Sequence, residues 1–209
     1  VAELGADVIA ERCAKNGITD IYMLTKGTGG LLGYNKTQFT DFLTRENRDV
    51  LQEMIDAGHA VGIRVHAWLC TMEDANFKTL NPDAGLWHYK RARDNNIITP
   101  YNPEYVAYMT AIAEELATGY DIDGIHLDYV RYNHMCNGWS EQDFANLEAM
   151  GAKTEDVRYL IEKTFYGVEG EEIDDQYIFN ALRNGDETAT LIAKYRRDNV
   201  VALATAIRD

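Results

Sequence analysis

His126 and Asp128 are the residues of this chain whose types and spacing best suit chemistry, because they stand two positions apart at the end of an apolar segment. Side chains on a β-strand alternate between its two faces, so a strand through residues 122–129 would place His126 and Asp128 on one face. Ile125 and Leu127 would lie on the opposite face and pack beneath helices. Parallel α/β barrels place reacting groups at the C-terminal ends of their strands. The segment therefore predicts a strand that presents an imidazole and a carboxylate to a cavity.

A second polar row is predicted in residues 61–70, where His66 and Trp68 would share one face of a strand. A lone histidine is usually a satisfied core residue, but two on neighbouring strands could hydrogen-bond a ligand or influence Asp128. His66, His126 and Asp128 could also bind a metal such as zinc. No close ligand spacing supports that alternative, and we expect neither a metal nor a cofactor.

Helices and strands alternate along the chain, which predicts a parallel α/β architecture. Helices are predicted at 1–15, 49–60, from 102 to about 116, 140–150, 154–163 and 187–208, and strands at 18–25, 61–70 and 122–129. The stretch 71–99 is expected to be irregular, and the acidic stretch 169–175 to be a solvated loop. A complete (β/α)8 barrel takes about 250 residues. The chain, with three or four strands, is therefore the first part of a barrel or forms a sheet of another kind.

Composition limits the possible partners. The 209 residues include 46% hydrophobic and 26% charged residues, which is typical of a globular protein with one sizeable core. The net charge of −14 would repel phosphate backbones, so we expect no nucleic-acid partner. No apolar run approaches the roughly 18 residues of a membrane helix. The cysteines lack metal-type spacing, and Cys13 and Cys70 are predicted to be buried thiols.

The segment 123–132, DGIHLDYVRY, resembles the strand of the glycosyl-hydrolase-like family 10 that carries its aspartate. Supporting matches follow in the family's order: 17–34 with its basic, glycine-containing loop, His66-Ala67-Trp68, the helix cap at Asn102-Pro103-Glu104, and 195–200 with Tyr in place of Trp. The resemblance covers most of the chain except an insertion at about 134–190. It implies a (β/α)8 TIM-barrel-like fold, here an incomplete, N-terminal part of the barrel. One domain is expected over 1–209, with the helical insertion following the Asp128 strand. The family is bacterial and mostly exported, which implies an extracytoplasmic location.

The resemblance implies that Asp128 is the nucleophile or principal carboxylate of glycoside cleavage. That reaction needs two carboxyl groups, about 5–5.5 Å apart for retention of configuration and about 6.5–9.5 Å for inversion. Glu73 and Asp74 follow the His66 strand and could reach the site, whereas related barrels take the acid from a later strand. The sequence leaves this choice open.

Substrate contacts are predicted for residues near the C-terminal ends of the strands and the start of the last helix. Aromatic rings could stack on sugars, and basic side chains could bind hydroxyl or carboxylate groups. The predicted substrate-binding residues are Lys26, His66, Trp68, His126, Tyr129, Arg131 and Arg196, and further aromatic candidates are Trp87, Tyr101 and Tyr132. The function expected is a glycoside hydrolase acting on a poly- or oligosaccharide. The alternative is a non-catalytic, carbohydrate-binding relative that keeps the cleft without the acid.

Overall fold

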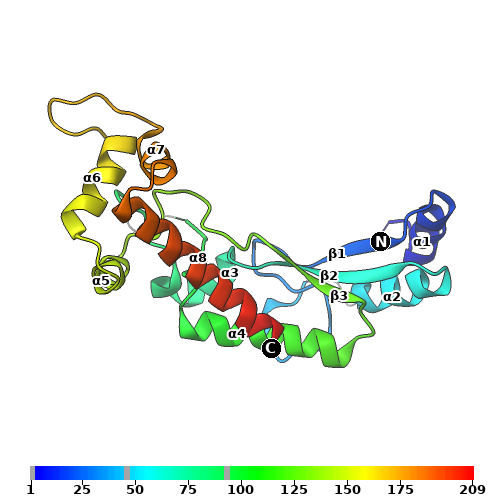
Figure 1. The fold of residues 1–209 in the computed structure, drawn as a ribbon. Coiled ribbons are helices and arrows are strands. Elements are labelled where there is room, and N and C mark those ends of the chain that lie inside the picture. Colours follow the sequence, from blue (N-terminus) through cyan, green and yellow to red (C-terminus); the bar gives the residue numbers. More distant parts are fainter. Residues whose placement is uncertain (1–2, 45–47, 92–94) are drawn as a thin grey trace.

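The computed structural model describes residues 3–44, 48–91 and 95–209. Its sheet has three parallel strands in the order β1-β2-β3, namely β1 (Asp20–Lys26), β2 (Arg64–Cys70) and β3 (Gly124–Asp128). Helix α2 (Val50–Ala60) connects β1 to β2, and α4 (Pro103–Gly119) connects β2 to β3 (Figure 1). The predicted alternation of helices with parallel strands is confirmed.

The remaining helices flank this unit. They are α1 (Ala6–Lys15), α3 (Ala75–Leu80), α5 (Glu141–Ala149), α6 (Thr154–Phe165), α7 (Tyr177–Arg183) and α8 (Glu187–Arg208), with short 3-10 helices at Thr40–Phe42 and Pro82–Ala84. The predicted bounds of α8 are confirmed. Two helices were not expected: α7, and α3 in the stretch predicted to be irregular. Helix α3 begins there because the Asp74 side chain accepts a hydrogen bond from the Phe77 N–H and caps its first turn.

Helix α4 begins as its sequence predicts. The Asn102 side chain accepts a hydrogen bond from the Tyr105 N–H at 2.8 Å, and Pro103 occupies the first helical position. Met109, Ile112 and other predicted apolar positions of this helix are buried against the sheet. Burial of this stripe is what holds the helix on the sheet, because the hydrophobic effect scales with the apolar area removed from water.

Helices cover only one face of the sheet. Val65, Ala67 and Leu69 of β2 are fully buried under α2 and α4, whereas Tyr22 and Leu24 of β1 are 51% and 53% exposed on the other face. Figure 1 shows α2 and α4 on one side of the strands and no helix over the opposite side. The uncovered face is therefore a sheet surface that presents aromatic and polar side chains.

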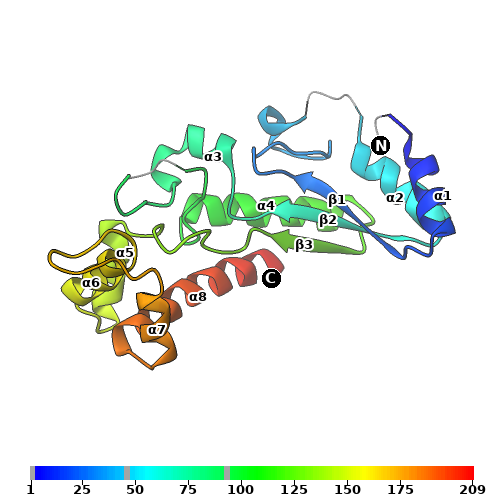
Figure 2. The same ribbon diagram turned by 90° about the horizontal axis from the view of Figure 1, so that it is seen from above.

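The strand register confirms the predicted alternation of side chains. His66 is level with Gly124, Trp68 with His126, and Cys70 with Asp128. The side chains at these positions share the uncovered face. In Figure 2 the strand arrowheads point toward the part of the molecule that holds α3, α5 and α6, so Asp128 stands at that end.

The apolar residues form two clusters. One surrounds the sheet with α1, α2 and α4, and the other joins α5, α6 and α7 within the range of the expected insertion. Helix α8 contributes to both, through Ile192 and Tyr195 at its start and Leu203 and Ile207 near its end. This helix therefore ties the helical group to the sheet unit.

The prediction that Cys13 is a buried thiol was wrong, because it is only half-buried on α1, whereas Cys70 is buried as predicted. Helix α1 buries small residues instead of large ones: Ala6 and Ala10 are buried, while Leu4 and Val8 are 52% and 39% exposed. Gly58 lies inside α2, where a Cβ would come within 2.7 Å of Val65 Cγ2. Close contact between elements selects small residues at these positions.

Asp20, at the start of β1, is expected to make the free energy of unfolding depend on pH. Its carboxylate accepts hydrogen bonds from Arg64, Thr19 and His66, which hold the pKa of Asp20 well below its ordinary value of 3.8. A depressed pKa contributes stability above the ordinary value, and this stability is lost as the pH falls toward the depressed one. Asp20→Asn should therefore destabilise the protein at about pH 7, and its difference from wild type should shrink below about pH 3.8. Urea midpoints of both proteins across this range measure it; a constant difference would contradict the assignment.

Candidate functional site

Asp128 occupies the predicted position at the C-terminal end of β3. Its two carboxylate oxygens are held by two donors: Trp68 Nε1 donates to Oδ2 at 3.1 Å, and the Tyr129 N–H donates to Oδ1 at 2.7 Å. The Thr71 N–H donates to the Asp128 carbonyl at 2.7 Å, which fixes the backbone beside β2. The carboxylate is half-buried and lies on the uncovered face of the sheet, so it is both oriented and reachable.

The residue after Asp128 has a strained backbone. Tyr129 has φ of 54°, and it is the one non-glycine residue with positive φ in the described part of the chain. Left-handed backbone costs a residue with a Cβ roughly 1–2 kcal/mol. Strain of this kind is retained where the surrounding structure imposes it, often at functional sites. The same residue donates its N–H to the Asp128 carboxylate, so the strain lies directly beside the candidate catalytic group.

The strain predicts an unusual order of stabilities for two variants. Tyr129→Ala removes the ring and keeps the left-handed penalty, whereas Tyr129→Gly removes the ring and the penalty together. The glycine variant should therefore be about 1 kcal/mol more stable than the alanine variant, the reverse of the order on ordinary backbone. Urea unfolding of the two variants measures the difference. A less stable glycine variant would show that Tyr129 is unstrained.

A row of aromatic side chains leads along the uncovered face from Asp128 through Trp68 and His126 to Tyr22. The His126 ring meets the rings of Trp68 and Tyr22 edge to face, with centroid distances of 6.2 and 5.2 Å. His126 is exposed, and Trp68 is half-exposed while it donates to Asp128. Trp68 therefore contacts the carboxylate and His126 contacts Trp68, while their binding of substrate stays a prediction.

His66 lies at the other end of the sheet from Asp128. It is level with Gly124, four strand residues before Asp128, which corresponds to about 13 Å. Its Nε2 pairs with Asp20 Oδ1 at 2.8 Å, and its ring stacks on Tyr22 at 4.7 Å. The structure therefore gives His66 a role in joining β1 to β2 rather than the predicted ligand contact.

Lys26 also differs from its predicted role, because its side chain is fully buried. Nζ lies 3.0 Å from Asp74 Oδ2 and donates to the carbonyls of Cys70 and Glu73 at 2.8 and 3.3 Å. The contact with Asp74 Oδ2 is an ion pair without hydrogen-bond alignment, whereas Oδ1 accepts from the Phe77 N–H. Burial lowers the pKa of the Lys26 ammonium, and Asp74 partly offsets that effect. Lys26 therefore connects the ends of β1 and β2 on the helix-covered side of the sheet and presents no charge to the uncovered face.

The glycine loop after β1 packs against the Asp74 carboxylate of the Lys26–Asp74 ion pair. Gly30 has φ of 81°, and a Cβ at this position would lie only 2.0 Å from Asp74 Oδ1. Glycine is required here because the loop backbone packs directly on the buried carboxylate.

The two predicted arginines have different surroundings. Arg131 is exposed, with its guanidinium 5.4 Å from the Tyr129 ring centroid. Arg196 is half-buried and donates to the carbonyls of His134 and Asn137 at 2.8 and 3.0 Å, with its guanidinium 4.1 Å from the Tyr132 ring centroid. Burial lowers the pKa of Arg196 to about 10. Arg131 is thus close to the Asp128 loop, while Arg196 braces the segment that follows it.

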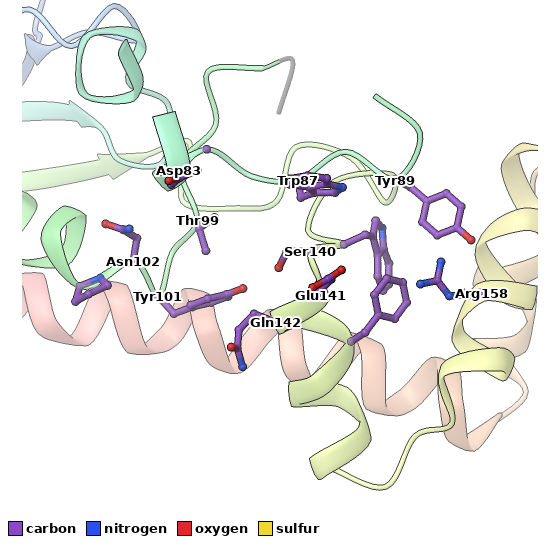
Figure 3. Close-up of a pocket in the computed structure, with 14 residues that line it drawn as sticks. Asp83, Trp87, Tyr89, Thr99, Tyr101, Asn102, Ser140, Glu141, Gln142 and Arg158 are labelled. Carbon is purple, nitrogen blue, oxygen red and sulfur yellow. The ribbon is translucent and has the colours of Figure 1, made fainter. Parts of the chain in front are cut away.

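A cavity of about 680 Å³ lies between the loop before α4 and the helical group (Figure 3). It is lined by Asp83, Gly85, Trp87, Tyr89, Thr99, Tyr101, Asn102, Pro103, Trp139, Ser140, Glu141, Gln142, Phe144 and Arg158. Trp87 and Tyr101 were among the predicted stacking residues. The others from the insertion were missed, since their approach to residues 83–103 depends on how α5 and α6 pack.

Within 3–44, 48–91 and 95–209 there is no group of three or more His, Cys, Asp or Glu side chains arranged to hold a metal ion. No helix in these ranges has the length and apolarity needed to cross a bilayer.

Parallel strands, covering helices and an oriented carboxylate at a strand's C-terminal end define an α/β protein with a candidate active site at that end. The family model of glycosyl hydrolase-like 10 matches residues 31–207. The chain therefore belongs to this family, as its resemblance predicted. Among curated protein sequences, none matches the chain.

Two solved structures resemble the fold. α-L-Fucosidase isoenzyme 2 from Paenibacillus thiaminolyticus aligns with a TM-score of 0.65 and 16% identity over 99% of this chain and 27% of that chain. A hypothetical protein from Ruminiclostridium thermocellum aligns with a TM-score of 0.56 and 16% identity over 73% of this chain and 79% of that chain. This chain thus spans about a quarter of the fucosidase that it resembles. At this identity the likeness shows the α/β fold.

Proposed function

We propose that the chain forms part of a glycoside hydrolase in which Asp128 is the central carboxylate. The observation that carries the proposal is the fixed orientation of this group: one donor from β2 and one from a strained backbone aim it onto the uncovered face. An ionised oxygen held in this way can attack an anomeric carbon or stabilise an oxocarbenium-like centre. The family match supports this chemistry.

The uncovered sheet face is proposed to be an arc of a (β/α)8 barrel. In such a barrel, helices cover only the outer face of the strands, and the reacting groups stand at the C-terminal ends. The three strands and the helices α2 and α4 have this arrangement. The unpaired edge of β3 is where a further parallel strand would be added.

Glu73 is the proposed proton donor within this chain. Of the two candidate acids after β2, Asp74 is fully buried, paired with Lys26 and engaged in capping α3. Glu73 is half-buried, and its side chain neither pairs with Lys26 nor caps α3. Cys70, the last residue of β2, is level with Asp128, so Glu73 follows β2 at the same end of the sheet as the Asp128 carboxylate. This position after the strand end supports Glu73 as the acid.

The substrate is proposed to be a glycan that contacts Trp68, His126, Tyr129 and Arg131. Trp68 and Tyr129 contact Asp128, His126 packs against Trp68, and Arg131 lies over the Tyr129 ring. Lys26, His66 and Arg196 instead hold structural positions. Rings and polar edges of this kind suit the apolar faces and hydroxyls of sugars. We propose an extracytoplasmic location from the family resemblance alone.

A hydrolysis screen tests the proposed function. The chain would be incubated with nitrophenyl glycosides, including the α-L-fucoside, and with neutral oligosaccharides, and released sugar would be measured. Turnover of at least one substrate that depends on Asp128 is expected. Oligosaccharide binding without turnover would instead establish the alternative, a carbohydrate-binding relative without catalytic activity.

A further inference from the structure

The cavity in Figure 3 is a second site that the catalytic assignment does not use. We propose that it binds a neutral sugar unit of the same glycan, at a distance from the unit that reacts at Asp128. The inference rests on the proposed function and specifies its substrate as an oligosaccharide that extends toward the helical group. Its volume of about 680 Å³ lies within the roughly 300–1,000 Å³ of small-molecule sites.

The walls of the cavity combine apolar rings with polar edges. Half-buried Trp87 and Tyr101 contribute aromatic surface, and exposed Gln142 contributes an amide group. In Figure 3, Ser140 and Glu141 lie between the side chains of Trp87 and Tyr101. A pyranose has apolar C–H faces and a rim of hydroxyls, so it matches this combination better than a purely apolar ligand does.

The charges that line the cavity favour a neutral ligand over an acidic one. Exposed Glu141 contributes a carboxylate beside the guanidinium of Arg158, so these two residues give the lining no surplus positive charge for an acidic ligand. That guanidinium lies 4.2 Å from the Phe144 ring centroid, so part of its charge is already directed to an aromatic face. The whole chain carries −14, which also disfavours phosphates and uronates.

The cavity is held in shape by a network around Asp143. This buried carboxylate accepts hydrogen bonds from Tyr101 at 2.8 Å and Tyr195 at 2.9 Å, and it accepts from the Ser140 N–H at 2.7 Å. These bonds connect the loop before α4 with α5 and α8. A wall fixed before binding lowers the ordering cost of the complex, which favours recognition of a rigid ring.

The cavity and Asp128 lie toward the same end of the sheet. The segment after β3 runs to the cavity wall, where the N–H groups of Gly138 and Trp139 donate to the Trp87 carbonyl at 2.9 and 3.1 Å. Figure 2 shows the strands pointing toward this helical group. A glycan that leaves Asp128 along this segment therefore meets the cavity.

Tryptophan fluorescence can test the proposal because the three tryptophans divide between the sites. Trp87 and Trp139 line the cavity, and Trp68 contacts Asp128. The full chain carrying Trp68→Phe and Asp128→Asn would be titrated with cello-oligosaccharides, fucosylated xyloglucan oligosaccharides and oligogalacturonides. A saturable emission change with a neutral probe is expected, and it should be weaker or absent with the acidic probe.

Substitutions at the cavity mouth complete the test. Glu141→Ala combined with Gln142→Ala changes exposed residues in the first turn of α5, so folding should be retained. The dissociation constant should rise at least about tenfold, the effect of losing one hydrogen bond to a neutral amide and one to a charged carboxylate. Glu155→Ala, in the first turn of α6 and outside the cavity, is the matched control and should leave binding unchanged.

The outcomes separate this proposal from the hydrolase assignment. No emission change with any probe, an unaltered dissociation constant in the double variant, or a preference for the acidic probe would each overturn the cavity proposal. Hydrolysis of glycosides with no cavity binding would leave the hydrolase and remove the second site. Cavity binding with no hydrolysis would leave the sugar site and remove the hydrolase assignment.

Discussion

Asp128→Asn should lower turnover by about three orders of magnitude or more, while the affinity for a substrate or product glycan stays close to that of wild type. Losing a central catalytic carboxylate has effects of this size. Asparagine keeps an oxygen that can accept from the Trp68 indole N–H or the Tyr129 N–H, so the local fold should persist. What is lost is the charge that attacks or stabilises the anomeric centre. Steady-state kinetics and calorimetric titration measure the two quantities.

Asp121→Asn is the matched control for this variant. Asp121 lies seven positions earlier in the chain, and its side chain is 91% exposed at the opposite end of β3. Its removal should leave turnover unchanged. In Asp128→Ala, azide could take the vacated space and restore part of the rate, with a glycosyl azide as product, which would identify the carboxylate as the nucleophile. An Asp128→Asn enzyme with the wild-type rate would refute the catalytic assignment.

Lys26→Met should cost about 3–5 kcal/mol of unfolding free energy, because it leaves the buried Asp74 carboxylate without its counter-charge. Methionine resembles the lysine stem in shape, so the loss comes from charge and hydrogen bonds rather than from a cavity. The Lys26 ammonium also reaches the Tyr105 hydroxyl at 3.3 Å, and so it connects the strand ends with α4. Urea unfolding followed by circular dichroism measures the change.

The double variant Lys26→Met with Asp74→Asn separates the charge effect from packing. Without the carboxylate, no uncompensated charge stays buried, and asparagine still caps α3. The double variant should therefore be more stable than Lys26→Met alone. Lys15→Met, an exposed lysine at the end of α1, should change stability little. Additive losses in the two buried substitutions would show that the ion pair has no net coupling.

Local sequence signals were sufficient where one element decides the outcome. The cap at Asn102-Pro103 and the apolar spacing after it determine α4, and alternation alone places His126 and Asp128 on one face of β3. Caps and side-chain alternation depend on residues that are close together in the chain. They could therefore be predicted without knowing which other elements pack against them.

Local sequence signals could not predict the roles of Lys26 and His66. Both are polar residues on predicted strands near glycines or aromatics, which is also what a ligand contact looks like in sequence. Whether each side chain meets a ligand or a partner depends on Asp74 and Asp20, which lie 48 and 46 positions away in the chain (74 − 26 and 66 − 20). The cavity has the same origin, since its lining comes from the loop before α4 and from the insertion.

By itself, the sequence determined the parallel α/β alternation, the membership of the glycosyl hydrolase-like 10 family and the position of Asp128 at the end of a strand. The tertiary structure alone decided which polar groups stay available to a ligand. The physical reason is that periodicity and capping are local, whereas burial and charge pairing are set by residues brought together from distant parts of the chain.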